Sequence, residues 1–121
     1  MRPDAPSVTF TVEGDPVGWQ RVGRTSRGIA YVPAKTRRFQ LAVYHAFLQQ
    51  NHGRFSVIGH PVTHMTVTCR FRHRRHPDPD NVLKNCLDAL TAIAYPNDNR
   101  IASSVDFQEG CRHPCTMVTV R

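Results

Sequence analysis

Acidic residues are scarce in this chain of 121 residues. Nine Asp and Glu stand against sixteen Lys and Arg, which gives a net charge of +7 and a pI near 9.9. No acid occurs between residues 16 and 77, although that segment carries eleven Lys and Arg. Such a balance favours an anionic partner, with nucleic acid first and an acidic membrane surface second.

Long apolar stretches are also missing. No window is apolar enough to span a bilayer, and the N-terminus lacks the apolar core of a signal peptide. We therefore expect a cytoplasmic protein with no membrane partner. The length predicts a single domain over residues 1–121, with a loose N-terminal tail over residues 1–7.

The four cysteines lack the pattern of a structural zinc site. Cys111 and Cys115 form a lone pair, and no second pair completes a tetrahedron. Cys69 and Cys86 lie within apolar patterns, so we interpret both as small core residues.

Apolar periodicity predicts an α+β fold. Alternation indicates strands at residues 8–13 and 62–71, with further strand candidates at 29–32, 101–108 and 115–120. A Gly- and Arg-rich loop is expected over residues 17–27. The order of elements predicts a small mixed β-sheet with two main α-helices packed on one face.

The two helices have recognisable boundaries. Helical spacing of apolar residues after Thr36 predicts a first helix, with Thr36 as N-cap and Gly53 at the stop. The second helix is expected from Asp80 to about Ala94. Pro79 disfavours helical geometry at Asp78, so Asp80 is the expected cap.

Four of the nine acids gather between residues 76 and 98. Asp78 and Asp80 flank a proline at a stiff strand-to-helix junction, where two negative charges repel unless a cation lies between them. Carboxylate oxygens are ligands that magnesium prefers. The alternative is a capped helix start with solvated carboxylates.

Lys84 and Asp88 follow Asp80 at a spacing of four, so all three share a helix face. Lys84 would face the charge that develops on a phosphate during cleavage. Asp88 either orients Lys84 from behind or forms an ordinary surface ion pair.

These residues carry a resemblance to a known family. Residues 77–84 (Pro-Asp-Pro-Asp-Asn-Val-Leu-Lys), residues 88–90 (Asp-Ala-Leu) and residues 97–101 (Asn-Asp-Asn-Arg-Ile) resemble the core signature of the RusA family of Holliday junction resolvases. Residues 10–16 and the basic loop after them are more loosely similar to that family's N-terminal half. The resemblance covers roughly residues 8–120.

The resemblance implies a homodimeric endodeoxyribonuclease of α+β fold that cuts branched DNA, the four-way junction above all. It implies Mg²⁺ as cofactor, with Mn²⁺ as a substitute. By position, Asp78, Asp80 and Asp98 become the metal-binding carboxylates, and Lys84 becomes the catalytic lysine.

Two positions depart from the family pattern. Asn97 stands beside Asp98 where the family usually has a second Asp, so it keeps an oxygen ligand but loses a charge that would strengthen metal binding. Trp19 lies in a loop where the family often has a lysine. It either stacks on an unpaired base near a junction or anchors the core.

Basic residues are expected to hold the DNA, and each neutralised phosphate adds about −0.9 to the slope of log affinity against log salt. His73 and His76 lie among arginines and would add charge below neutral pH, but neither is assigned as a catalytic base. The predicted DNA contacts are Arg21, Arg24, Lys35, Arg37, Arg72, Arg74 and Arg75.

The distance to Asp98 leaves two arrangements open. A helix from Asp80 to Ala94 would separate its ends by about 21 Å, and four further residues span at most about 14 Å. Either the helix stops early and the chain runs back, or Asp98 of the partner subunit completes the site. Two other functions also stay open: a non-catalytic basic DNA-binding protein, and a less selective nuclease of branched DNA.

Overall fold

The computed structural model describes residues 7–20, 23–51, 62–91 and 101–121. It contains six strands and two helices in these ranges. The elements are β1 (Val8–Glu13), β2 (Gly23–Arg24), β3 (Ala30–Tyr31), α1 (Ala34–Gln50), β4 (His64–Arg70), α2 (Pro79–Leu90), β5 (Ala102–Gln108) and β6 (Cys115–Val120). No helix in these ranges is both long and apolar enough to cross a bilayer.

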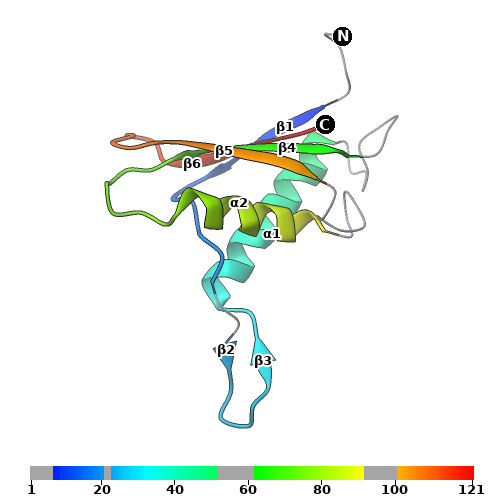
Figure 1. Cartoon of the computed structure of the whole chain (residues 1–121), viewed down its shortest axis with the longest axis vertical. Helices are drawn as coiled ribbons and strands as arrows, with labels where there is room; N and C mark the ends of the chain where they lie inside the picture. Colours follow the sequence, from blue (N-terminus) through cyan, green and yellow to red (C-terminus); the bar gives the residue numbers. More distant parts are fainter. Residues whose placement is uncertain (1–6, 21–22, 52–61, 92–100) are drawn as a thin grey trace.

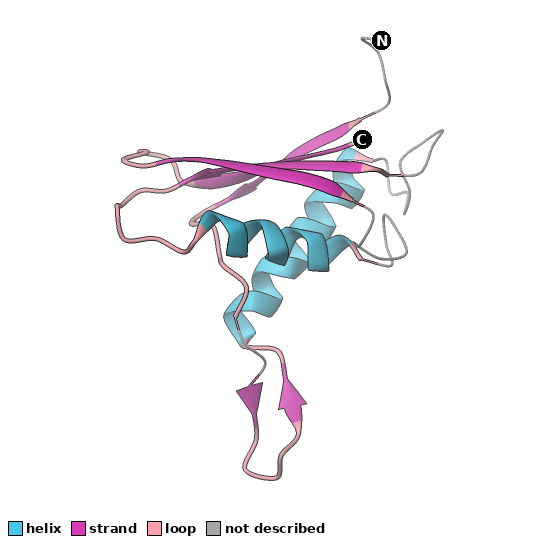
Figure 2. Cartoon of the chain, viewed as in Figure 1, coloured by secondary structure: helices cyan, strands magenta, loops and turns pink. Residues whose placement is uncertain are grey.

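Four strands form one mixed sheet in the order β1-β6-β4-β5. Strand β6 pairs antiparallel with β1 and β4, whereas β4 and β5 run parallel. Both helices lie on the same side of this sheet (Figures 1 and 2). The predicted α+β fold, with a mixed sheet and two helices on one face, is confirmed.

The core fills the space between the sheet and the helices. Alternate strand residues such as Val67 and Val118 are fully buried, and the Phe10 ring meets Phe47 of α1 edge-on at 6.1 Å between centroids. Cys69 and Cys86 are also fully buried, as predicted. Burial raises the pKa of the Cys69 thiol to about 12 and raises that of Cys86 as well, so both thiols stay neutral.

The start of α1 differs from the prediction. The helix begins at Ala34, and Pro33 rather than Thr36 occupies the N-cap position. Thr36 lies inside the first turns, almost fully buried, and its hydroxyl donates a 2.8 Å hydrogen bond to Oε1 of Gln20. The Thr36 hydroxyl therefore bonds to Gln20, sixteen positions earlier in the sequence, and does not cap the helix. Gly53, the predicted stop, lies outside the described residues.

The boundaries of α2 also needed correction. Asp78, not Asp80, is the N-cap, because Pro79 takes the first helical position, where the missing N–H of proline costs no hydrogen bond. The helix ends at Leu90, since Thr91 has an extended backbone. Ala94, where we expected the end, lies outside the described residues.

The predicted loop over residues 17–27 contains β2, which periodicity did not reveal, whereas β3 lies within the strand candidate predicted at residues 29–32. Strands β2 and β3 pair over two residues each and form a hairpin that projects away from the sheet and helices (Figure 1). Gly28 has a φ of +77° in its turn, a conformation that side chains rarely tolerate. The strand ladder itself covers two residue pairs, and hydrogen bonds between Thr25 and Ile29 continue it into the turn.

Candidate functional site

Asp78 and Asp80 lie where the loop after β4 enters α2. One carboxylate oxygen of Asp78 accepts a 2.9 Å hydrogen bond from the backbone N–H of Asp80. Both side chains are exposed, and the positive end of the helix dipole favours negative charge at this place. The cap therefore places both aspartates in the first turn of α2, with one carboxylate fixed to the backbone of the other residue.

The charges of the two carboxylates can be compared with the basic residues that the structure describes around them. Within the described ranges, neither Asp78 nor Asp80 forms an ion pair with an arginine or lysine. Two exposed, ionisable oxygen donors on one turn fit a hard divalent cation, which needs few protein carboxylates and keeps several waters. Asp98 and Asn97, the remaining predicted members, lie outside the described residues.

His76 fastens the loop that carries Asp78. Its ring stacks on Phe71 with 3.8 Å between centroids and 5° between planes. Nδ1 lies 2.8 Å from the carbonyl oxygen of Pro77, and Nε2 lies 2.7 Å from Oε2 of Glu109. The contact with the Pro77 carbonyl, helped by Glu109 and opposed by burial, raises the pKa of His76. Two acceptors thus hold the ring in place.

Lys84 lies one helical turn beyond Asp80, and its Nζ is 3.9 Å from the centroid of the Trp19 ring. The Trp19 backbone N–H donates to the carbonyl of Asn81 at 2.9 Å, which ties the residue to the same helix. Sequence reasoning assigned Lys84 but missed this neighbour. Trp19 and Lys84 are sixty-five positions apart in the sequence, so no spacing rule could have paired them.

A basic pocket adjoins the carboxylates. It has a volume of about 190 Å³ and brings together Lys35 from the start of α1 with Arg72 and Arg75 from the loop after β4. Pro77, directly before Asp78, lines the same pocket, as does the acid Asp15. Three of the seven predicted DNA contacts therefore converge next to the candidate site, and their role in binding stays a prediction.

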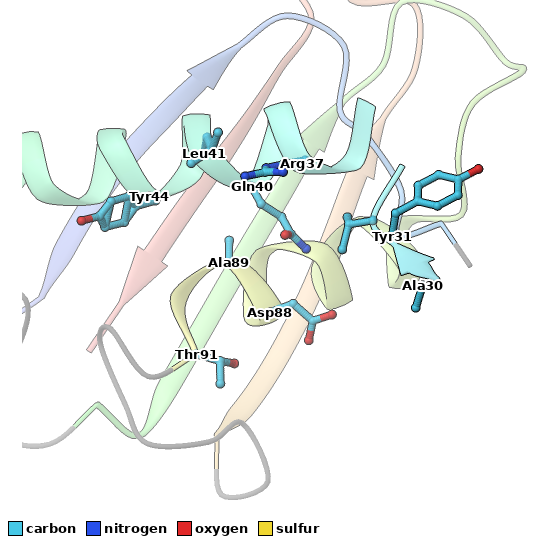
Figure 3. Close-up of a pocket in the computed structure, with 10 residues that line it drawn as sticks. Ala30, Tyr31, Arg37, Gln40, Leu41, Tyr44, Asp88, Ala89 and Thr91 are labelled. Atoms are coloured by element: carbon cyan, nitrogen blue, oxygen red, sulfur yellow. The ribbon is translucent and has the colours of Figure 1, made fainter. Parts of the chain in front are cut away.

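The other predicted contacts lie elsewhere. Arg37 and Asp88 line a larger groove of about 590 Å³ between the two helices and the hairpin (Figure 3). Arg24 closes the hairpin turn by donating from Nη1 to the carbonyl of Gly28 at 3.1 Å. Arg74 is exposed in the loop after β4, and Arg21 lies outside the described residues.

An α+β domain that holds a pair of exposed carboxylates beside a basic pocket has the layout of a protein that acts on nucleic acid. Comparison with models of protein families gives a match to Endodeoxyribonuclease RusA over residues 13–121. The chain belongs to the RusA family of endodeoxyribonucleases, which are Holliday junction resolvases. The resemblance seen in the sequence is thus confirmed, whereas a comparison with curated proteins found no match.

Asp78 caps α2 and also carries a negative charge, and mutation can separate these two properties. Asp78→Ala should lower the free energy of unfolding by about 0.5–2 kcal/mol, because the cap is lost. Asp78→Asn should change it far less, because Asn is an equally good cap, although the charge is gone. Urea unfolding of both variants measures the difference, and equal losses would contradict the capping role.

The bond between His76 and Glu109 should make stability depend on pH. Because the folded pKa of His76 is raised, the bond stabilises fully below the ordinary histidine pKa and is lost as pH rises through the raised value. Glu109→Gln should therefore destabilise the protein more at pH 5.5 than at pH 8.5. Unfolding by urea at both pH values tests this, and a pH-independent difference would refute it.

Proposed function

We propose that this chain is a structure-selective endodeoxyribonuclease that resolves Holliday junctions by magnesium-dependent hydrolysis of phosphodiester bonds, in DNA recombination and repair. One observation carries the proposal. A protein with net charge +7 keeps Asp78 and Asp80 exposed, adjacent and unpaired with its arginines among the described residues. Two carboxylates on a protein of net positive charge suit the binding of a divalent cation and of a polyanionic substrate.

Asp78 and Asp80 would hold the magnesium ion, and Asp98 would join them by its place in the family signature. Manganese, which has similar oxygen ligands, should substitute. When bound, the ion supplies Lewis-acid stabilisation of charge on the scissile phosphate and on the leaving oxygen. Asn97 would support the ligands from outside the metal shell, and Asp88 would orient Lys84.

The remaining residues would bind and orient the DNA. Lys35, Arg72 and Arg75 line the pocket beside the carboxylates, where guanidinium groups can grip phosphates flanking the scissile bond. Lys84 lies one turn from Asp80, and its ammonium would offset the negative charge that grows on the phosphate as water attacks. Rigid attachment of the loop by His76 would keep the carboxylates in position.

We also propose that the active protein is a homodimer with shared sites. Asp98 lies four positions before Ala102, so the link spans at most about 14 Å. Ala102 begins β5, whereas Glu109, which holds the Asp78 loop through His76, follows the other end of that strand. Ala102 and Gln108 lie about 20 Å apart at the usual rise. This separation favours completion of each site by Asp98 of the partner subunit.

The proposed activity can be tested on three labelled substrates: a four-way junction, a fork and a linear duplex, each with and without magnesium. The wild-type protein should nick the junction symmetrically and leave linear duplex intact, and only with the metal. Asp80→Asn should bind the junction with wild-type affinity and cut at least 100-fold more slowly, because one ligand charge is lost.

Other outcomes of this assay select other functions. Cutting of fork and junction alike would indicate a less selective nuclease of branched DNA. Binding without cutting in magnesium or manganese would indicate a non-catalytic DNA-binding protein, a reading that Asn97 keeps open. Normal cutting by Asp80→Asn would remove the metal-ligand assignment.

Shared sites predict complementation between inactive chains. Asp78→Asn and Asp98→Asn proteins should each fail to cut, and mixed dimers should recover part of the activity, because one of the two sites is then intact. Junction cleavage by co-refolded mixtures measures the recovery. A mixture as inactive as its components would favour sites built from one chain.

A further inference from the structure

The segment that carries Trp19 is fastened to both helices. The Trp19 N–H donates to the Asn81 carbonyl at 2.9 Å, and the Asn85 side-chain amide donates to the Val17 carbonyl at 3.0 Å. Gln20, the next residue, accepts the hydroxyl of Thr36 in α1 at 2.8 Å. Three hydrogen bonds within four residues therefore hold this extended segment along the start of α2.

Gly18 lets the segment come this close. A Cβ placed on Gly18 would lie 3.0 Å from Cβ of Pro77 and 3.3 Å from Cβ of Asn81, which is tighter than ordinary packing. The segment thus packs directly on the turn that carries Asp78 and Asp80. This close contact and the hydrogen bond from the Trp19 backbone to Asn81 fix the backbone of Trp19 beside that turn.

The indole then meets the one exposed cation on this part of α2. Nζ of Lys84 is 3.9 Å from the ring centroid, well within the range in which an ammonium is attracted to an indole face. Lys84 is exposed, and its four-carbon stem is intrinsically flexible. The indole face supplies an attraction that limits where the ammonium can lie.

We propose that Trp19 is a positioning residue that holds the Lys84 ammonium beside the carboxylate pair before the substrate arrives. The role rests on the proposed function, because it matters only if Lys84 acts on the scissile phosphate. Trp19 itself need not touch DNA. The ring face covered by Lys84 is closed to a stacking base, which argues against the base-stacking role considered from the sequence.

The contact can be tested without DNA or metal, because Trp19 is the only tryptophan in the chain. Lys84→Met removes the charge from the ring and should change the intensity or wavelength of tryptophan emission. Lys35→Met is the matched control, since Lys35 is the only other lysine and lines a different pocket. Unchanged emission in Lys84→Met would overturn the contact.

The consequence for catalysis is tested by single-turnover cleavage at saturating junction. Trp19→Leu should slow the chemical step about two- to fivefold, the range expected for loss of a cation–π contact at an exposed site. Its junction affinity should stay within about twofold of wild type, because phosphate contacts elsewhere carry binding. Trp19→Phe keeps an aromatic face and should recover much of the rate, which a loss of folding in Trp19→Leu could not mimic.

Two results would overturn the positioning role. Weaker junction binding with an unchanged cleavage rate in Trp19→Leu would instead support base stacking. Equal, full activity in Trp19→Leu and wild type would show that the contact does not serve catalysis. By contrast, a wild-type protein that cuts no junction in magnesium or manganese would refute the proposed function itself.

Discussion

The hydrogen bond from the Asp80 backbone to the Asp78 carboxylate is the contact on which the site depends. This bond caps α2, which begins at Pro79. The position of a helix start determines which residues lie on each face of the helix. With that start, Asp78 and Asp80 share one turn, and Lys84 follows one turn later. A helix begun two residues further on, as a cap at Asp80 would require, would leave Asp78 on a freer loop.

Charge and rigidity are arranged together around this turn. Two exposed carboxylates side by side repel each other, and a flexible loop would relieve the repulsion by moving them apart. Here Pro77 and Pro79 restrict the backbone on both sides, while His76 is stacked on Phe71 and bonded to Glu109. These restraints leave the turn that carries Asp78 and Asp80 little freedom to rearrange.

The sequence predicted elements whose signal is local and missed contacts whose partners are distant. Strands β1 and β6 were predicted at their observed bounds, because alternation alone marks a half-buried strand. The start of α1 was wrong, since Thr36 bonds Gln20 rather than its own helix. The carboxylate turn was found from composition and motif, but the cap was assigned to the wrong aspartate, because either side chain could have filled that role.

The contacts of Asn85 limit which substitutions this part of the chain can tolerate. Its side chain is fully buried; Oδ1 accepts from Gln40 of α1 at 2.9 Å and the amide nitrogen donates to the carbonyl of Val17. A buried amide with both ends engaged tolerates few replacements, because each leaves a polar group unsatisfied. The N-terminal segment, α1 and α2 are thus coupled through one side chain. Exchanging the first forty residues with those of a distant relative should disturb the nuclease motif even where every motif residue is kept.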